Sequence, residues 1–267
     1  MRLNNMLVFA GFTPSSPLLL PSINTNKLAQ VRATLVALEE LSAELYAAHP
    51  DTLVILSESQ IMYKEAFSLN LADPYLAELI ECGDLGYKKL YHPDFALIDS
   101  LQRYCRKLEL PVSLSTDANL NVSTVVALEL LTAHLPHLRI VPIAPCDLEA
   151  KAHFNFGIAL KHLLLESDQR IAVIAAGDMS HSLSKSSPAG YHKDGRTFDQ
   201  TILAMLKEHN ASGLLQIPIT LIKHAEETSY RQLCLLTGVL DGMYTAPNIL
   251  SYEAPFGVGY CVANFVL

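Results

Sequence analysis

Residues 171–181 read IAVIAAGDMSH, and this stretch decides the fold class. A continuous run of small and β-branched apolar residues is typical of a strand that helices cover on both faces. The run ends abruptly in a glycine, a carboxylate, a hydroxyl and an imidazole, where open α/β sheets bind their ligands. The stretch therefore predicts a central strand of an α/β sheet, with a candidate site at its carboxyl end.

Similar patterns on both sides of this stretch extend the prediction to the whole chain. Short apolar runs predict further strands at residues 7–12, 53–57 and 140–143, and two strands around a turn at residues 249–266. Apolar residues at three- and four-residue spacing predict covering helices at residues 26–48, 93–108, 122–134, 148–165, 197–209 and 224–242. No linker or internal repeat divides the chain, so we predict a single αβα sandwich domain over residues 1–267.

The composition excludes several classes of protein. The 267 residues carry 19 Lys plus Arg against 27 Asp plus Glu, a net charge of −8, and 50% are hydrophobic. This balance argues against nucleic-acid binding, which depends on clusters of Lys and Arg. No apolar run approaches the roughly 18 residues that a membrane span needs. The five cysteines form no C-x-x-C pair, which favours reduced, buried thiols, and we expect a cytoplasmic protein that contacts neither nucleic acid nor membrane.

Asp178 and His181 carry the strongest chemical signal. Histidine is the side chain whose ordinary pKa lies near neutrality, and a neighbouring carboxylate can hold its ring in one tautomer. This interpretation makes His181 and Asp178 candidate catalytic residues. In the alternative interpretation, Asp178 and Ser180 cap a turn and His181 is structural, and the residues alone leave both open.

A second, weaker signal lies at His224 and Glu227. Three-residue spacing would place an imidazole and a carboxylate on one helical face, a spacing that metal sites in helix bundles also use. The same carboxylates beside Arg231 fit a solvated helix face with an ion pair equally well. A G-x-S-x-G elbow and the phosphate-loop and dinucleotide fingerprints are all absent from the sequence, which argues against those chemistries.

Several segments, in this order, resemble one known superfamily. They are residues 13–21 (TPSSPLLLP), 50–57 (PDTLVILS), 177–181 (GDMSH), 188–191 (PAGY), 227–242 and 254–260 (APFGVGY). The combination is similar to the class III extradiol ring-cleavage dioxygenases of the LigB-like type, to which Memo-like proteins and the AmmeMemoRadiSam system protein B group are related. The resemblance implies a LigB-like (phosphorylase/hydrolase-like) αβα fold over nearly the whole chain.

The resemblance also implies a site. Active members hold non-haem Fe(II) with two His and one Glu, and a further His acts as acid and base. The positions that match the two histidine ligands are Ser15 and Ser59 here, whereas Glu227 matches the third ligand and His181 the acid–base residue. A further pocket histidine is replaced by Ala118. The resemblance therefore leaves Glu227 as the remaining ligand-equivalent.

These substitutions predict that catalytic iron has been lost, because a serine hydroxyl is a poor substitute for imidazole at divalent iron. We expect no cofactor, or Fe(II) if the family activity is retained. We expect Ser15, Ser59, Ala118 and Tyr191 to contact a substrate-like small aromatic molecule in the remnant pocket, or an unknown protein partner, and a homo-oligomer stays open. The alternatives are an active non-haem iron oxidoreductase that cleaves a catechol-type ring with atypical ligands, and a metal-independent acid–base enzyme that uses His181.

Overall fold

The strands form one mixed sheet with a parallel centre. The computed structural model describes residues 6–267. Its strands are β1 (Leu7–Thr13), β2 (Thr52–Leu56), β3 (Phe67–Asn70), β4 (Tyr75–Leu79), β5 (Asp84–Pro93), β6 (Val112–Ser115), β7 (Arg139–Ala144), β8 (Ile171–Ala176), β9 (Ala246–Glu253) and β10 (Tyr260–Val266). The strand order is β4-β5-β7-β2-β8-β1-β10-β9, and β3 pairs with β6 and β7. Neighbours from β5 to β1 along this order are parallel, while the β4–β5 and β10–β9 pairs are antiparallel.

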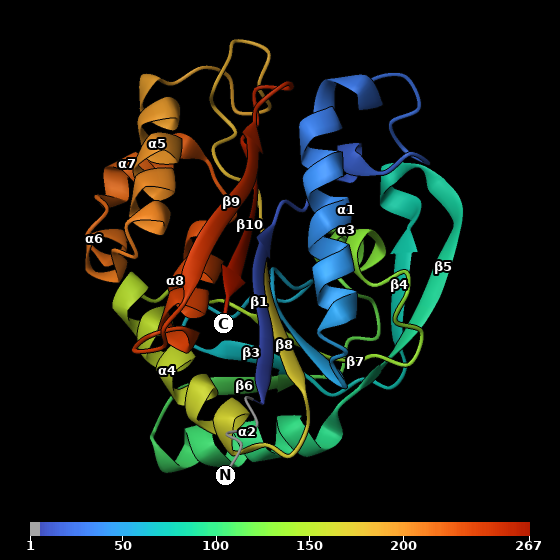
Figure 1. Cartoon of the computed structure of the whole chain (residues 1–267), viewed down its shortest axis with the longest axis vertical. Helices are drawn as coiled ribbons and strands as arrows, with labels where there is room; N and C mark the ends of the chain where they lie inside the picture. Colours follow the sequence, from blue (N-terminus) through green and yellow to red (C-terminus); the bar gives the residue numbers. More distant parts are fainter. Residues whose placement is uncertain (1–5) are drawn as a thin grey trace.

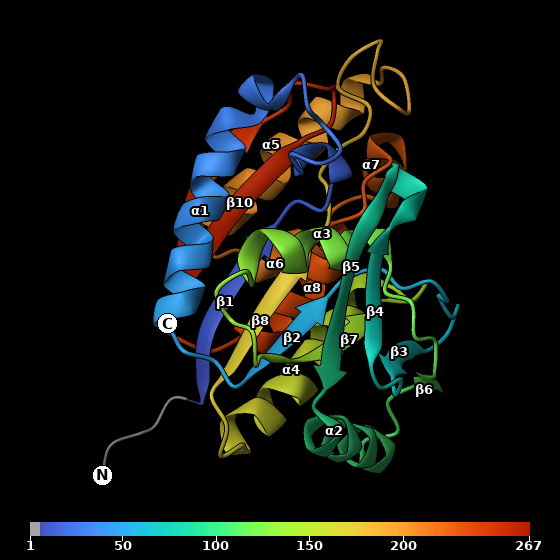
Figure 2. The ribbon, with the colours of Figure 1, turned by 90° about the vertical axis from the view of Figure 1, so that its right-hand side faces the viewer.

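Helices cover both faces of this sheet. They are α1 (Arg32–Ala47), α2 (Phe95–Lys107), α3 (Val122–Leu131), α4 (Ala150–Glu166), α5 (Lys193–Lys207), α6 (Ala211–Leu215), α7 (Ile219–Ala225) and α8 (Tyr230–Val239), with short 3-10 turns at Pro17–Leu19, Leu28–Val31 and Ile80–Cys82. Figure 1 shows α1 and α3 on one side of β1 and β8, and α4, α5 and α8 on the other. In Figure 2 the β4–β5 hairpin forms an outer edge, with α2 below it.

Alternating strand residues feed two separate cores. In β2, Leu53 and Ile55 are buried in the cluster that α1 and α3 contribute, whereas Val54 and Leu56 are buried in the cluster of α2, α4, α5 and α8. Strands covered on both faces have no solvent side, which is why their sequences are continuous apolar runs. The αβα sandwich expected from the sequence is confirmed, and no helix within residues 6–267 is long and apolar enough to cross a membrane.

The helix expected at residues 224–242 is wrong in its first part. The helix is interrupted at Glu226, whose backbone adopts a left-handed conformation with φ of 53°. Helix α7 therefore ends at Ala225, and α8 begins at Tyr230. His224 and Glu227 therefore do not share a helical face. The physical reason is a capping interaction, because the Glu227 carboxylate accepts hydrogen bonds from the first backbone N–H groups of α8.

Candidate functional site

Asp178 lies at the carboxyl end of β8 and is almost fully buried. Its Oδ1 accepts a hydrogen bond from the Ser15 backbone N–H at 2.8 Å, which joins the segment after β1 to the segment after β8. Burial raises the pKa of Asp178 to about 7, although the backbone N–H groups of Ser15 and Ser16 oppose the shift. The nearby carboxylate of Glu58 adds to the increase. The pKa of the Asp178 carboxyl group therefore lies near neutral pH.

His181 stands beside this carboxyl group. Its Nε2 lies 3.8 Å from Asp178 Oδ2, which is too long for a direct hydrogen bond, and its Nδ1 is buried without a hydrogen-bond partner. The backbone N–H of His181 donates to Ala225 O at the end of α7. Burial lowers the pKa of the imidazole, which favours the neutral ring. The structure thus brings the two predicted acid–base residues together.

A glycine makes this close arrangement possible. A Cβ atom on Gly177 would lie 2.3 Å from Thr228 O and 2.8 Å from Ser229 Cα, so no other residue fits between β8 and the start of α8. The Asp178 backbone N–H then donates to Thr228 Oγ1 at 2.9 Å. Residues 177–178 and 227–229 are therefore held side by side.

The Glu227 carboxylate caps the start of α8. Its Oε2 accepts hydrogen bonds from the backbone N–H groups of Ser229 and Tyr230, both at 2.5 Å, and a longer one from Ser229 Oγ at 3.2 Å. Burial raises the pKa of Glu227, while these hydrogen bonds oppose the increase. This carboxylate satisfies two of the otherwise unpaired N–H groups at the helix start.

Glu227 also lines the roomiest cavity near the site, which has a volume of about 730 Å³. Glu58, which follows β2, lines the same cavity, and burial raises its pKa while the Arg231 guanidinium opposes the shift. Arg231 itself is paired with Asp147 at 3.0 Å. We call this cavity the Glu58–Arg231 pocket, and its charged groups are mostly carboxylates, with Arg231 and Lys223 as the cations. Apolar walls come from Met62, Leu148, Ile217, Ile222 and Tyr230.

The other expected contact residues lie apart from this pocket. Ser59 lines a much smaller hollow of about 20 Å³ with Asn70 and Asn121, and its hydroxyl donates to Ile61 O within its own loop. Ala118 is exposed, and its carbonyl oxygen accepts the Leu76 N–H at 2.7 Å, which ties it to β4. The side chain of Tyr191 is 62% exposed. The sequence predicts one common pocket for these residues and Glu227, but Ser59, Ala118 and Tyr191 do not line the cavity that Glu227 lines.

Glu58 is the residue that sequence reasoning missed. The segment Ser57-Glu58-Ser59-Gln60 stands out in the sequence as a polar loop directly after a strand, and the matching family position drew attention to Ser59. In the structure, Glu58 lines the same cavity as Arg231, and its charge contributes to the raised pKa of Asp178. The available signal was the lone carboxylate at a strand's carboxyl end, where ligands of α/β sheets bind.

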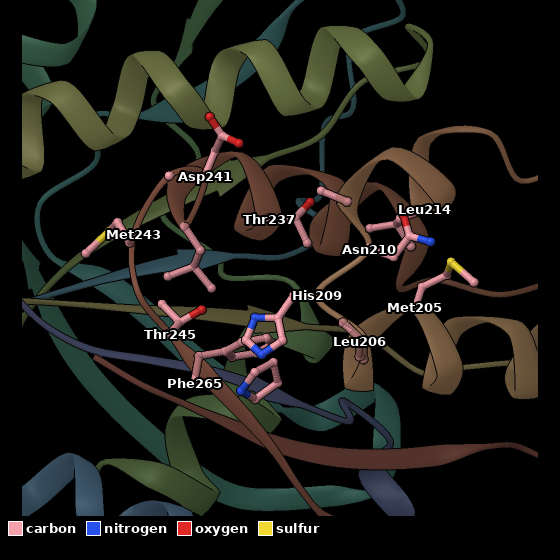
Figure 3. Close-up of a pocket in the computed structure, with 14 residues that line it drawn as sticks. Met205, Leu206, His209, Asn210, Leu214, Thr237, Asp241, Met243, Thr245 and Phe265 are labelled. Atoms are coloured by element: carbon pink, nitrogen blue, oxygen red, sulfur yellow. The ribbon is translucent and has the colours of Figure 1, made fainter.

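A second cavity lies elsewhere on the molecule and has a different character. It has a volume of about 150 Å³ and is lined mainly by residues at the ends of α5 and α8, in α6 and in β10. Figure 3 shows Met205, Leu206 and Phe265 around its apolar part, with His209 and Thr237 as polar groups. None of the predicted site residues lines it.

The comparison with known families assigns the chain. A model described as the catalytic LigB subunit of aromatic ring-opening dioxygenase matches residues 10–263. The chain belongs to the LigB family. A curated relative, Protein CA_C1420 of Clostridium acetobutylicum, is 24% identical over 260 residues, which cover 93% of this chain and 55% of the relative. This LigB-family chain therefore spans about half the length of that relative.

A solved structure supports the fold. The uncharacterized protein JW3007 from Escherichia coli K12 superimposes with a TM-score of 0.64 at 17% sequence identity, covering 97% of this chain and 100% of that one. At this level of identity, the likeness concerns the LigB-type fold alone.

The side chains at the three positions that the sequence resemblance matches to the iron ligands are a poor fit for Fe(II). Positions 15 and 59 offer hydroxyl groups, and the Oε2 of Glu227 is already hydrogen-bonded to α8. Within residues 6–267, the one group of three or more His, Cys, Asp or Glu side chains with metal-binding spacing is His192, Asp194 and His224, and it does not include Glu227.

Proposed function

We propose that this LigB-family protein works without catalytic iron and binds a small organic molecule in the Glu58–Arg231 pocket. The observation that carries the proposal is the position of Glu227. The carboxylate that the resemblance matches to the third iron ligand is hydrogen-bonded to the start of α8, and it lines an open cavity of about 730 Å³. Cavities of about 300–1,000 Å³ are the usual size for small-molecule sites.

The lining indicates the chemistry of the ligand. Glu58 and Glu227 accept hydrogen bonds, Arg231 donates them, and Leu148 and Ile222 supply an apolar wall. A small aromatic molecule with hydroxyl or amino substituents suits this combination, because its ring contacts the wall while its polar groups meet the carboxylates. The proposed ligand class is therefore small aromatic molecules with such substituents.

The loss of iron is tested by anaerobic Fe(II) titration in a His224→Ala background, which removes the separate His–Asp cluster from the measurement. We expect no Fe(II) binding that depends on Glu227. Adding Ser15→His and Ser59→His supplies the two imidazoles of the family pattern and tests whether they can share an ion with Glu227, although Ser59 and Glu227 line different cavities. Stoichiometric Fe(II) in the background protein that disappears on Glu227→Gln would contradict the proposal. Equally weak binding by a folded triple variant would mean that positions 15, 59 and 227 do not face one point.

Ligand binding is tested by saturation-transfer NMR with catechol, tyramine and related phenols. We expect binding that weakens on Arg231→Gln, because the guanidinium is a charged hydrogen-bond donor beside the pocket's carboxylates. Arg106→Gln, an exposed change in the last turn of α2, is the matched control. Ligand signals of equal strength in both variants would place the binding outside the pocket.

A second candidate function is metal-independent acid–base catalysis by Asp178 and His181. The observation that favours it is the combination of a carboxyl group with a pKa of about 7 and a neutral imidazole whose Nε2 lies 3.8 Å away. Efficient acid–base groups have pKa values near the working pH. The test is solvent deuterium exchange into a set of small carbonyl compounds, followed by proton NMR. Exchange that is the same with His181→Ala and with the parent would exclude this candidate.

A further inference from the structure

Two histidines and an aspartate meet where α5 and α7 come together. His192 is the N-cap residue of α5, Asp194 lies in the first turn of that helix, and His224 lies in the last turn of α7. One ligand atom from each residue lies within 4.8 Å of the others. His224 Nδ1 is 2.7 Å from Asp194 Oδ2, and His192 Nδ1 is 3.7 Å from the same oxygen. The two imidazole rings lie 4.1 Å apart, centroid to centroid.

The backbone holds both histidines in place. The His192 N–H donates to Ser182 O at 2.9 Å, and Ser182 Oγ donates to His224 O at 2.8 Å. A single serine thus fixes the main chain of both residues, although they are far apart in sequence. The positions of the two imidazoles relative to Asp194 are therefore set by the fold, while the side chains remain partly open to solvent.

The spacing suits a divalent transition metal. Ligands about 2.0–2.1 Å from a tetrahedral Zn²⁺ lie roughly 3.3 Å from one another. The distance of 3.7 Å is near this value, and the 2.7 Å hydrogen bond between His224 and Asp194 would have to open by roughly 0.6 Å. Binding through His192 Nδ1 would also replace a long hydrogen bond of 3.2 Å from the Asp194 N–H. Partly exposed side chains adjust by such amounts through small rotations.

We propose that His192, Asp194 and His224 form a binding site for Zn²⁺ or a similar divalent transition metal, with solvent completing its coordination. Imidazole and carboxylate ligands select this class of metal over Mg²⁺ and Ca²⁺, which take oxygen ligands. The site is separate from the LigB-family position, since it shares no residue with Ser15, Ser59 or Glu227. A metal there joins the start of α5 to the end of α7, beside the segment that carries His181.

The test is calorimetric titration of chelator-treated protein with ZnCl₂, followed by X-ray absorption at the zinc edge. We expect roughly one Zn²⁺ per chain, bound by nitrogen and oxygen ligands. His224→Ala and Asp194→Asn should each weaken binding at least about tenfold. His192→Asn removes the third ligand with a residue that still caps a helix, so this variant keeps its fold. His162→Ala, an exposed histidine of α4, is the matched control and should bind as the parent does.

Two outcomes overturn the inference. One is a parent protein that takes up no Zn²⁺ at 100-fold molar excess, or that binds it as tightly after His224→Ala as before. The other is binding that survives His224→Ala but is lost on Glu227→Gln, which would place the metal at the family position and would contradict the proposed function as well. Loss in the cluster variants with retention in Glu227→Gln supports both proposals separately.

Discussion

Asp199 is a carboxylate enclosed by polar partners inside the core. Its Oδ1 accepts the Ser180 N–H at 2.9 Å, and its Oδ2 accepts the Tyr252 hydroxyl at 2.6 Å, so α5 is tied both to the segment that carries His181 and to β9. Burial raises the pKa of Asp199 to about 6, and both hydrogen bonds oppose the shift. The folded state therefore binds a proton here over a range of pH in which the unfolded chain has released it.

This difference predicts a pH dependence of stability. Because the pKa in the folded state lies above the unfolded value near 3.8, the contribution of Asp199 is complete below that pH and is lost as the pH rises to about 6. Asn at this position keeps hydrogen-bonding groups toward Ser180 and Tyr252 but does not titrate. From pH 4 to 6, Asp199→Asn should gain stability relative to the parent by up to about 1.4 kcal/mol per pH unit. Urea unfolding across that range measures the gain, and a difference that does not vary with pH would contradict it.

At the scale of single residues, the sequence predicted a site formed by residues close together in the chain, and it missed the pairing of residues that are far apart in the chain. Asp178 and His181 stand close together in a recognisable segment, and the structure places them side by side. The pairing of Asp194 with His224 joins residues from two helices, so it depends on how α7 packs on α5. The role of Glu227 as a cap was hidden because a helical pattern continues through it.

The α4 and α8 helices approach each other unusually closely through a glycine. A Cβ atom on Gly157 would lie 2.2 Å from Leu235 O and 2.9 Å from Gly238 Cα, both backbone atoms of α8. Backbone cannot give way as a flexible side chain can. The residues at the start of α8 line the Glu58–Arg231 pocket, so the packing of α8 on α4 positions Glu227 and Arg231.

We expect Gly157→Ala to lower the free energy of unfolding by about 1–3 kcal/mol, the usual cost of overpacking. The intrinsic helix preference of alanine works in the opposite direction and is smaller. Gly86→Ala in β5 is the matched control, because its Cβ would meet only the Asp84 side chain at 3.7 Å. Urea denaturation of the three proteins checks this, and equal stability of Gly157→Ala and Gly86→Ala would show that α8 can shift without cost.

Among the elements, continuous apolar runs decided which central strands the sequence predicted. The strands β1, β2, β7 and β8 are almost wholly buried, and their apolar runs predicted them. In contrast, β5 is mostly exposed and β6 only partly buried, and the buried strand β3 has only four residues, two of them Ser68 and Asn70. None of these strands has a continuous apolar run, and they were missed together with β4.

At the scale of the molecule, the chain has the LigB-type sandwich, and we propose that it works without the family's iron. We therefore expect no ring-opening absorbance above a protein-free control when the protein is incubated with catechol or protocatechuate, Fe(II) and air. The physical reason is that two hydroxyl groups and a capping carboxylate cannot hold iron with open positions for substrate and dioxygen. Turnover that is lost in His181→Ala would contradict this prediction and would restore the family chemistry.

The pairing of β1 with β10 joins strands from opposite ends of the sequence, which matters during translation. β1 pairs with β8 on one side and with β10 on the other, where Gly11 faces Asn264 and Phe12 faces Ala263. Translation at about 5–20 residues per second delivers β10 roughly 12–50 seconds after β1. For that whole interval the nascent chain carries an apolar strand with an unfilled edge, the kind of surface that pairs with other chains. Chaperones that bind extended apolar segments on the ribosome would bind β1, and they would have to stay bound until β10 has been synthesised.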